Sequence, residues 1–207
     1  PGMYVGEPGT GAMYHDCIYI LMKEVIDNSV DEFVMNHGKK IDVSVNYDTG
    51  ETSVRDYGRG IPLEKVVDCV SQMNTGGKFD SDNFQFSAGM NGVGTKAVNA
   101  LSEFFEVRAF REGEYSEGFF EEGRLKSKKR GQCRIREPNG TFIRYKPDVK
   151  VLKNFKVREE HVVRRMRMYC YVNAGPTINL NGQSICSEGG LADLVADEAQ
   201  FEKLYAP

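Results

Sequence analysis

The sequence predicts an α+β fold, a layered sandwich of helices and a mostly antiparallel sheet, in one compact domain. Segments whose apolar residues recur every three or four positions, as in amphipathic helices, are interspersed with short runs of alternating polarity typical of strands. These helices and strands do not follow a regular β-α-β order, which favours the α+β class. A length of 207 residues fits a single domain.

The first half of the chain supplies clear element signals. Asp16–Phe33 is predicted as a long helix with one buried apolar face. Ile41–Tyr47 alternates apolar and polar residues, Asp48–Gly50 supplies turn chemistry, and Glu51–Asp56 runs back, so a hairpin is expected. A further helix is predicted from Pro62 to about Met73, since proline is favoured at the first helical position.

The middle of the chain is rich in glycine. The 22 glycines exceed the roughly 7% average and cluster in 58–60 and 76–94. The second of these stretches has no sustained periodicity, which favours a functional loop. The elements predicted beyond it are a short helix (95–101), strands (105–110, 115–120, 124–129, 141–145), a helix (158–171), a strand (177–180), a turn at Asn181-Gly182 and a final helix from Leu191.

Composition limits the classes of function. The five cysteines are scattered with no Cys-x-x-Cys pair, which argues against a zinc site and for free thiols in a reducing cytosol. No membrane-spanning run and no signal peptide are visible, so a cytoplasmic protein without membrane contact is expected. A net charge of -3 makes the whole domain a poor binder of nucleic-acid backbones, so any DNA contact must be local. The abrupt ends at Pro1 and Pro207 suggest one domain of a longer protein.

Two polar residues of the first predicted helix stand out. Glu24 and Asn28 are four residues apart and therefore lie on one face, one turn from each other. The apolar stripe of the helix lies elsewhere. A carboxylate and an amide placed in this way could serve a site, but a solvated helix face explains them as well.

Two glycine motifs follow. Asp56–Pro62 contains Gly58 and Gly60 around one arginine, which allows either a tight strand-to-helix turn or close approach of the main chain to a ligand. In Gly89–Lys96, glycines precede a predicted helix, an arrangement that suits an anion. The dinucleotide fingerprint and the P-loop both fail on spacing; Gly77-Lys78, for instance, is followed by Phe79.

The order of these motifs resembles the GHKL (Bergerat) ATPase family. Within it, the chain is similar to the N-terminal domain of the B subunits of bacterial type IIA topoisomerases, gyrase B and topoisomerase IV B. The resemblance implies a single ATP-binding domain over residues 1–207, with a mixed, mostly antiparallel sheet covered by helices on one face. The blocks that carry it are Pro1–Gly6, Glu24–Glu32, Asp56–Pro62, Gly76–Asp80, Gly92–Gly94 with Val98–Ser102, and Gly140-Thr141.

The resemblance also implies roles for single residues. Glu24 would be the catalytic base that deprotonates the attacking water, and Asn28 would bind Mg²⁺. Asp56 would accept a hydrogen bond from the adenine amine, supported by Thr141 through a water. The further ATP-binding residues that the resemblance implies are Gly58, Gly60, Ile61, Lys78, Asn91, Gly92, Val93 and Gly94, the last four wrapping the phosphates at the end of a lid over about 75–94. Arg59 would pair with Glu32 at the pocket mouth, beside Pro62.

The chain departs from the family pattern at three positions. Many gyrase B chains have a histidine one turn before the glutamate, where this chain has Ile20. A second lid lysine corresponds to Gln85, and an arginine of the outer inhibitor pocket corresponds to Glu117. These departures bear on base activation, lid contacts and coumarin affinity. The segment Asp16–Glu24 is closer to topoisomerase IV-type chains than to gyrase.

The resemblance implies partners for the full-length protein: ATP, Mg²⁺, DNA, an A-type subunit, and a second B subunit on ATP binding. Competitive inhibitors would bind the ATP site. The family completes catalysis with a lysine from a following transducer domain and an N-terminal arm. Since neither is expected within this chain, it should bind ATP, turn over weakly and stay monomeric.

Alternatives remain open from the sequence. The same asparagine, aspartate and glycine motifs occur in mismatch-repair, chaperone and histidine-kinase relatives. A non-catalytic nucleotide-binding module is a further possibility, which the presence of Glu24 argues against. A basic cluster could face DNA or form a solvated edge strand. Its residues are Arg124, Lys126, Lys128, Lys129, Arg130, Arg134 and Arg136. A second group of arginines lies in the late predicted helix and is explained by an ordinary solvated helix face; these are Arg158, Arg164, Arg165 and Arg167.

Overall fold

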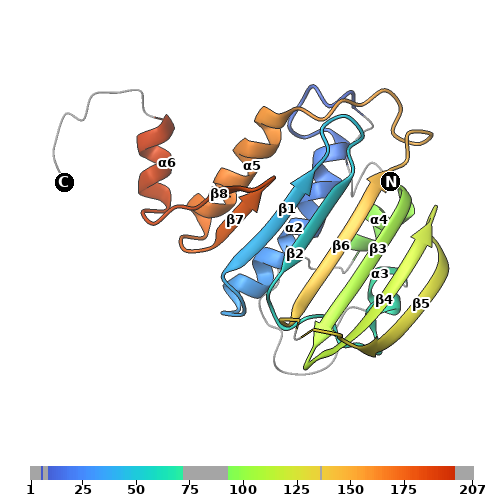
Figure 1. The fold of residues 1–207 in the computed structure, drawn as a ribbon. Helices are drawn as coiled ribbons and strands as arrows, with labels where there is room; N and C mark the ends of the chain where they lie inside the picture. The colour runs from blue at the N-terminus through green and yellow to red at the C-terminus, as the bar shows by residue number, and fades with distance from the viewer. Residues whose placement is uncertain (1–5, 7–8, 72–92, 136, 199–207) are drawn as a thin grey trace.

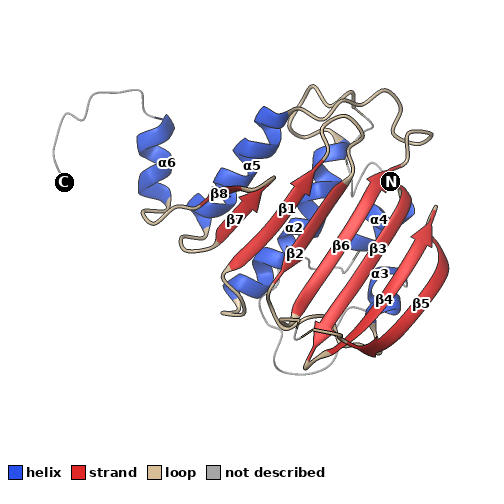
Figure 2. Cartoon of the chain, viewed as in Figure 1, coloured by secondary structure: helices blue, strands red, loops and turns tan. Residues whose placement is uncertain are grey.

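The computed structural model describes residues 6, 9–71, 93–135 and 137–198. In these residues an eight-stranded sheet is covered by helices on one face, so the predicted α+β sandwich is confirmed (Figure 1; Figure 2). Within the described part of the chain, no helix is long and apolar enough to cross a membrane.

The elements follow the predicted order with small shifts of their ends. They are α2 (Cys17–Val34), β1 (Lys40–Val45), β2 (Thr52–Asp56), α3 (Val66–Ser71), α4 (Gly94–Ala100), β3 (Ser102–Arg111), β4 (Glu114–Glu121), β5 (Arg124–Gln132), β6 (Gly140–Pro147), α5 (Glu159–Val172), β7 (Thr177–Leu180), β8 (Gln183–Ile185) and α6 (Leu191–Glu198). Two differences stand out. The helix predicted from Pro62 begins only at Val66, and the short strand β8 was not predicted.

The strand order is β5-β4-β3-β6-β2-β1-β7-β8. Every neighbouring pair is antiparallel except β1 and β7, which are parallel. The hairpins β3–β4 and β7–β8 turn through Glu112-Gly113 and Asn181-Gly182, each with two positive φ angles. Such turns match the twist of paired strands, which explains why these short turn sequences set the register of the sheet.

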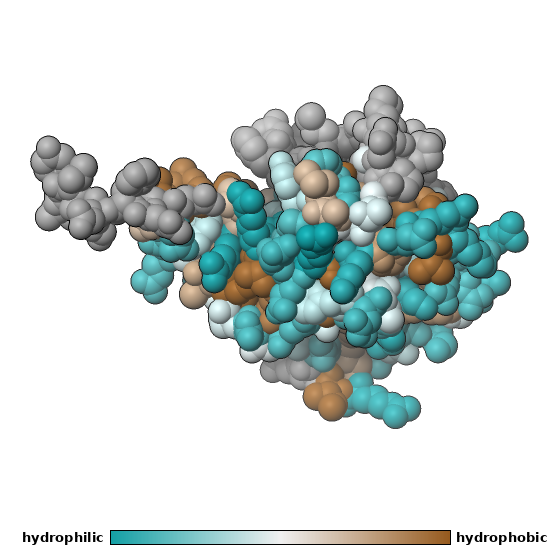
Figure 3. All heavy atoms as spheres, turned by 90° about the horizontal axis from the view of Figure 1, so that it is seen from above, coloured by the Kyte–Doolittle hydropathy of each residue, from teal (hydrophilic) through white to brown (hydrophobic). Residues whose placement is uncertain are grey.

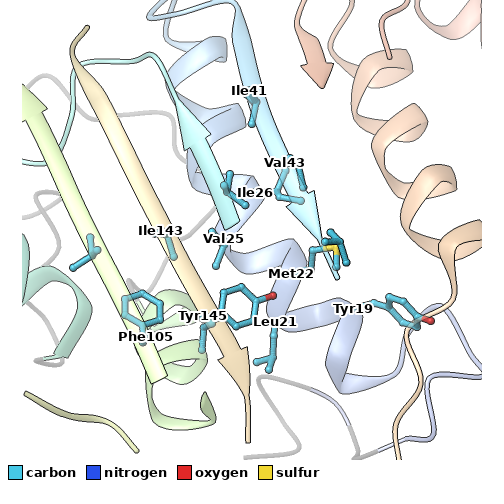
Figure 4. Close-up of a cluster of buried hydrophobic side chains, with 14 of the residues drawn as sticks. Tyr19, Leu21, Met22, Val25, Ile26, Ile41, Val43, Phe105, Ile143 and Tyr145 are labelled. Carbon is cyan, nitrogen blue, oxygen red and sulfur yellow. The ribbon is translucent and has the colours of Figure 1, made fainter. Parts of the chain in front are cut away.

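The hydrophobic core lies between the sheet and α2. Leu21, Met22, Val25 and Ile26 project from the helix onto β1, β2 and β6, and the close-up shows their side chains facing Ile143 and its neighbours (Figure 4). Helices α3, α4 and α5 extend the same layer and contact α4, α2 or the sheet. Because the apolar stripe of α2 faces the sheet, its polar residues face the ends of β2 and α4.

The opposite face of the sheet is covered by its own long polar side chains. Arginines lie over partly buried aromatic rings: Arg144 over Phe104 at 5.3 Å and Arg55 over Phe110 at 4.7 Å from the ring centroids. Such cation–π contacts cover apolar rings; Arg144 stays exposed, whereas Arg55 is buried and donates to the backbone oxygen of Pro138 at 2.7 Å. Seen from above, the described surface is mostly hydrophilic with smaller apolar areas between (Figure 3).

Candidate functional site

The polar face of α2 brings the candidate residues together. Glu24, Asn28, Ser29 and Glu32 lie on successive turns; the first two meet the start of α4, and the last two meet Asp56 and Arg59 at the end of β2 and in the turn after it. Eight residues of helix separate Glu24 from Glu32, which corresponds to about 12 Å at 1.5 Å per residue. One rigid helix therefore spaces the whole candidate site.

Glu24 is half-buried where α2 meets α4. Burial raises the pKa of Glu24; the Lys23 ammonium, 3.9 Å from Oε1, opposes this shift, and Asp27 adds to it. Lys23 is itself held by Asp27, whose carboxylate lies 2.5 Å from Nζ. A Cβ at Gly94 would stand well inside 3.0 Å of the Glu24 carboxylate. The glycine at the start of α4 is what lets this carboxylate fit.

Asn28 is exposed and has a defined orientation. Its Nδ2 donates to the backbone oxygen of Glu24 at 2.8 Å and to Oγ1 of Thr95 at 2.8 Å. Both donors of the amide are therefore used within the described residues, and its oxygen Oδ1 faces away from these two partners. A neutral, hard oxygen in this position suits a cation such as Mg²⁺.

Asp56 is the buried carboxylate of the site, only 5% exposed. Its Oδ1 accepts hydrogen bonds from the backbone N–H groups of Gly58, at 2.9 Å, and Thr141, at 3.1 Å. Oδ2 has a single long contact, 3.5 Å from the hydroxyl of Ser29. Burial raises the pKa of Asp56 to about 6, although both backbone hydrogen bonds and the charge of Arg55 act to lower it. One oxygen is thus bound by the protein, and the other remains able to accept from a ligand.

The glycines after β2 are required by close packing. At Gly58 a Cβ would stand within 3.0 Å of the Glu32 side chain. Gly60 has φ +77° and lies so close to the backbone oxygens of Phe110 and Gly140 that a Cβ would clash with both. Only glycine fits such a position, because positive φ and the missing Cβ are both needed there.

Arg59 and Glu32 form a multiple contact beside this turn. The Glu32 carboxylate accepts from the Arg59 backbone N–H at 2.8 Å, from Nε at 3.2 Å and from Nη2 at 2.8 Å. Burial by itself would raise the pKa of Glu32, but the hydrogen bonds and charge of Arg59 outweigh it and leave the pKa below its usual value. The expected pairing is present. Ile61 and Pro62 follow, both half-buried, and Ile61 packs against the core.

Comparison with known proteins shows the family of the chain. The family described as "Histidine kinase-, DNA gyrase B-, and HSP90-like ATPase" matches residues 15–150 of the chain. The chain belongs to this family. Its ATPases include the GHKL proteins that the sequence motifs resemble.

Several relatives of this ATPase domain are topoisomerase B subunits. The chain is 42% identical to the B subunit of DNA topoisomerase 4 from Borreliella burgdorferi, over 98% of its length and 33% of that protein. It is 35% identical to the B subunit of DNA gyrase from Mycolicibacterium smegmatis, over 98% of the chain and 30% of that protein. The chain thus spans about a third of the length of these relatives. The mismatch-repair and chaperone alternatives are not favoured.

A solved structure has the same fold. The 43K ATPase domain of Thermus thermophilus gyrase B, in complex with an aminocoumarin, superposes with a TM-score of 0.79 at 26% identity. The match covers the whole of this chain and 55% of that one. The expected Bergerat sandwich is therefore confirmed.

The ATPase domain contains contacts that the sequence did not reveal. Ser29, Thr95 and Arg111 carry no sequence signal of their own, yet Ser29 contacts Asp56, Thr95 contacts Asn28, and the Arg111 side chain lies 3.2 Å from where a Gly60 Cβ would be. The first two contacts join distant segments, so no local pattern predicts them. Arg111 is the last residue of β3, directly before the Glu112-Gly113 turn, and that turn is the sequence signal that could have indicated its position.

The correspondence of Glu117 to an arginine of the outer inhibitor pocket stays a prediction. Glu117 lies on the open face of the sheet, where it forms ion pairs with Arg108 at 3.2 Å and Lys129 at 3.2 Å. Its neighbours along β4, Ser116 and Gly118, are the residues that face the helices. The arginine beside the glycine turn of the ATPase domain is Arg111.

Other predicted positions are only partly visible. Lys78, Gln85, Asn91 and Gly92 lie outside the described residues, together with most of the predicted lid. Val93 immediately precedes α4, and Gly94 is its first residue, so the helix starts one residue earlier than expected. Ile20 is half-buried and packs against the core. Position 20 therefore serves packing in this member of the ATPase family.

The basic cluster forms an edge strand. β5 is the outermost strand of the sheet, and three of its cations pair with carboxylates of β4: Lys126 with Glu121, Lys129 with Glu117, and Arg130 with Glu114, at 3.0–3.2 Å. Arg136 lies outside the described residues. Because three of the five cations on β5 are paired, the solvated edge strand is favoured over a DNA-binding surface; Arg134 lies just beyond the strand. On α5, Arg164 and Arg167 are exposed, whereas Arg165 donates to the backbone oxygen of Tyr14 at 2.9 Å. Arg158, which caps the start of α5, lies 3.6 Å from Glu160.

Proposed function

We propose that this chain is the ATP-binding and ATP-hydrolysing domain of a type IIA DNA topoisomerase B subunit. In the full-length protein it would drive ATP-gated passage of one DNA segment through another. The observation that carries the proposal is the arrangement along α2, where Glu24 and Asn28 meet the start of α4, and Ser29 meets the buried Asp56. This arrangement supports the proposal, because Asp56, at the end of β2, contacts the same helix that carries Glu24, so that one carboxylate would serve the adenine and the other the attacking water.

Asp56 would recognise adenine. Its Oδ2 would accept from the exocyclic amine, while Thr141 would support the contact through a water. The different contacts of the two Asp56 oxygens support this role. Oδ1 already accepts hydrogen bonds from Gly58 and Thr141, whereas Oδ2 has only the long contact to Ser29. Gly58 and Gly60 would let the purine lie against the main chain. Competitive inhibitors would occupy the same place, with Arg59, Glu32 and Pro62 at the mouth.

Magnesium fits the residues at the other end. Mg²⁺ is usually held by one or two protein oxygens together with phosphate oxygens and water, rather than by a complete protein cage. The described residues contain no cluster of three or more His, Cys, Asp or Glu side chains that could hold a metal. Asn28 Oδ1 is an oxygen of the required kind, and when bound the cation would neutralise phosphate charge during phosphoryl transfer.

Glu24 would hold the attacking water and accept its proton. A general base works best when its pKa lies near the working pH, and burial raises the pKa of Glu24 in this direction. A non-catalytic nucleotide-binding module would need no such base. The glycine segment that ends at Val93 and Gly94, with Lys78, Asn91 and Gly92 before it, would cover the phosphates.

The complete protein would bind partners that this chain alone does not reach. We propose DNA, an A-type subunit, and a second B subunit on ATP binding, as well as cytoplasmic action. The higher identity to topoisomerase IV B, 42% against 35% for gyrase B, supports the topoisomerase IV type. The isolated chain would bind ATP, hydrolyse it weakly and remain a monomer.

A crystal soaked with a non-hydrolysable ATP analogue and Mg²⁺ tests the proposal. The adenine is expected within hydrogen-bond distance of Asp56 Oδ2, and the triphosphate is expected to run towards Asn28 and Glu24. An analogue bound on another surface, or bound with its adenine away from Asp56, would refute the proposed site.

A further inference from the structure

One hydrogen bond joins two halves of the site that are 67 residues apart in sequence. Asn28 on α2 donates from Nδ2 to Oγ1 of Thr95 on α4, over 2.8 Å. The same Nδ2 donates to the Glu24 backbone oxygen, also over 2.8 Å. Thr95 is half-buried, and it immediately follows Gly94, whose missing side chain lets α4 approach Glu24.

These two contacts hold the Asn28 amide in one orientation. A primary amide can turn over and exchange the places of its oxygen and nitrogen, since the two atoms are nearly equal in size. The Glu24 carbonyl can only accept, so the atom facing it must be the nitrogen. The Thr95 hydroxyl can donate as well as accept, so it does not choose between the two amide atoms. By taking the second N–H of Nδ2 it holds the amide plane against rotation, with Oδ1 on the opposite side. The carbonyl of Glu24 alone is a weaker restraint, because it lies on the same helix and accepts helical hydrogen bonds as well.

We propose that Thr95 is a positioning residue for the metal ligand Asn28, and that it couples metal binding to the docking of α4 on α2. The inference rests on the proposed function, in which Asn28 Oδ1 binds the magnesium ion of ATP. Thr95 touches neither the metal nor the nucleotide. It acts by keeping the ligand oxygen turned towards the phosphates, and partners that orient a ligand in this way commonly change metal affinity by about 10- to 100-fold when they are removed.

Two substitutions separate the hydroxyl from the shape of the side chain. Thr95→Val keeps the branched shape and removes the acceptor, whereas Thr95→Ser keeps the acceptor and removes a methyl group. Thr177→Val, on β7, is the matched control, since it makes the same chemical change on a strand remote from α2 and α4. Thermal unfolding of each variant confirms that the fold is intact before binding is measured.

The experiment measures binding of a non-hydrolysable ATP analogue by isothermal titration calorimetry, with Mg²⁺ and with EDTA. The magnesium advantage is the Kd in EDTA divided by the Kd in Mg²⁺. Thr95→Val is expected to reduce this ratio by about tenfold and to leave the Kd in EDTA unchanged. Thr95→Ser and Thr177→Val should keep the wild-type ratio, and Asn28→Ala should abolish the advantage.

The outcomes distinguish the inference from the proposed function. A wild-type ratio in Thr95→Val, with the advantage lost in Asn28→Ala, overturns the role of Thr95 alone. A wild-type chain that shows no magnesium advantage removes the metal from the proposed function, and the inference with it. Asp56→Asn should weaken binding equally in both buffers and keep the ratio, because it acts at the adenine end.

The hydrogen bond between Asn28 and Thr95 can be tested by NMR without nucleotide. The side-chain amide of Asn28 gives its own pair of ¹⁵N–¹H resonances, which should shift in Thr95→Val and stay in place in Thr95→Ser and Thr177→Val. Identical resonances in wild type and Thr95→Val would show that the hydrogen bond does not exist in solution, and would overturn the inference.

Discussion

Gly94 is packed against Glu24 so closely that a Cβ at position 94 would stand well inside 3.0 Å of the Glu24 carboxylate oxygen. The first residue of α4 therefore limits where the proposed catalytic base can be. Because the clashing atoms belong to a side chain, an added methyl group would push Glu24 away rather than break the fold.

Gly94→Ala is expected to reduce ATP hydrolysis by the full-length protein strongly and to lower stability by about 1–3 kcal/mol through overpacking. The matched test is a double-mutant cycle in thermal unfolding. In a Glu24→Ala background the clash is gone, and Gly94→Ala should then stabilise by about 0.4–1 kcal/mol, since alanine has less freedom in the unfolded chain. Equal effects in both backgrounds would show that the two residues are not in contact.

Glu24→Gln should lower the rate at which the full-length protein hydrolyses ATP by about 10²–10⁴-fold, the usual contribution of a general base. The amide keeps the shape of the side chain and cannot take a proton. Affinity for a non-hydrolysable analogue should stay within about twofold, because Glu24 is not proposed to hold the ground-state nucleotide. A variant that hydrolyses ATP at the wild-type rate would remove Glu24 from its role.

Asp56→Asn should weaken ATP binding while it stabilises the fold. The new side chain can keep its oxygen towards Gly58 and Thr141, which places an NH₂ group where Oδ2 would meet the adenine amine. Burial raises the pKa of Asp56 from 3.8 to about 6, so ionising it costs stability as pH rises through this range. About two pKa units correspond to about 3 kcal/mol as an upper value.

The pH dependence provides the check on Asp56. Asp56→Asn should be more stable than wild type at pH 8, and the difference should fall towards pH 4, where the native carboxyl is protonated. Chemical denaturation at both pH values measures it. A variant less stable than wild type at pH 8, or one with unchanged ATP affinity in calorimetry, would contradict the assignment.

Arg59→Ala should lower stability by about 1–2 kcal/mol at neutral pH, because a partly buried, multiply hydrogen-bonded pair is stronger than an exposed one. The folded pKa of Glu32 lies below its usual value of 4.5, so its ionised form stabilises the native state above that pH. The difference from wild type, measured by chemical denaturation, should therefore shrink as pH falls below about 4.5. Lys150→Ala, which breaks the exposed pair with Glu122, is the control and should show no measurable change.

Much of the fold follows from local patterns. The apolar spacing in 16–33 predicted α2 to within one residue at each end, and the alternation in 41–56 predicted the β1–β2 hairpin. The glycines at 58 and 60 were predicted to allow a tight turn or close approach to a ligand, and Gly94 to precede a helix that suits an anion; the structure gives each a neighbour in the chain itself that a Cβ would meet. These signals are readable because each reports the burial or backbone geometry of its own segment.

Long-range pairing was less predictable. Glu117 was matched to an arginine of the outer inhibitor pocket from its place in the chain, whereas the arginine that packs beside Gly60 is Arg111, at the end of β3. A shift of one residue moves a strand's side chains to the other face, so small errors in alignment change the site entirely. The strand β8 and the parallel pairing of β1 with β7 depend in the same way on which segments meet.

The sequence alone determined the helices, the first hairpin, the order of the polar and glycine motifs, and with them the family. The tertiary structure decided which atoms of those motifs are free to act: Asp56 Oδ2 because Oδ1 is bound by two backbone donors, and Asn28 Oδ1 because Nδ2 is bound by Thr95 and Glu24. A residue pattern specifies which groups are present, but their direction is set by partners that only folding brings into contact.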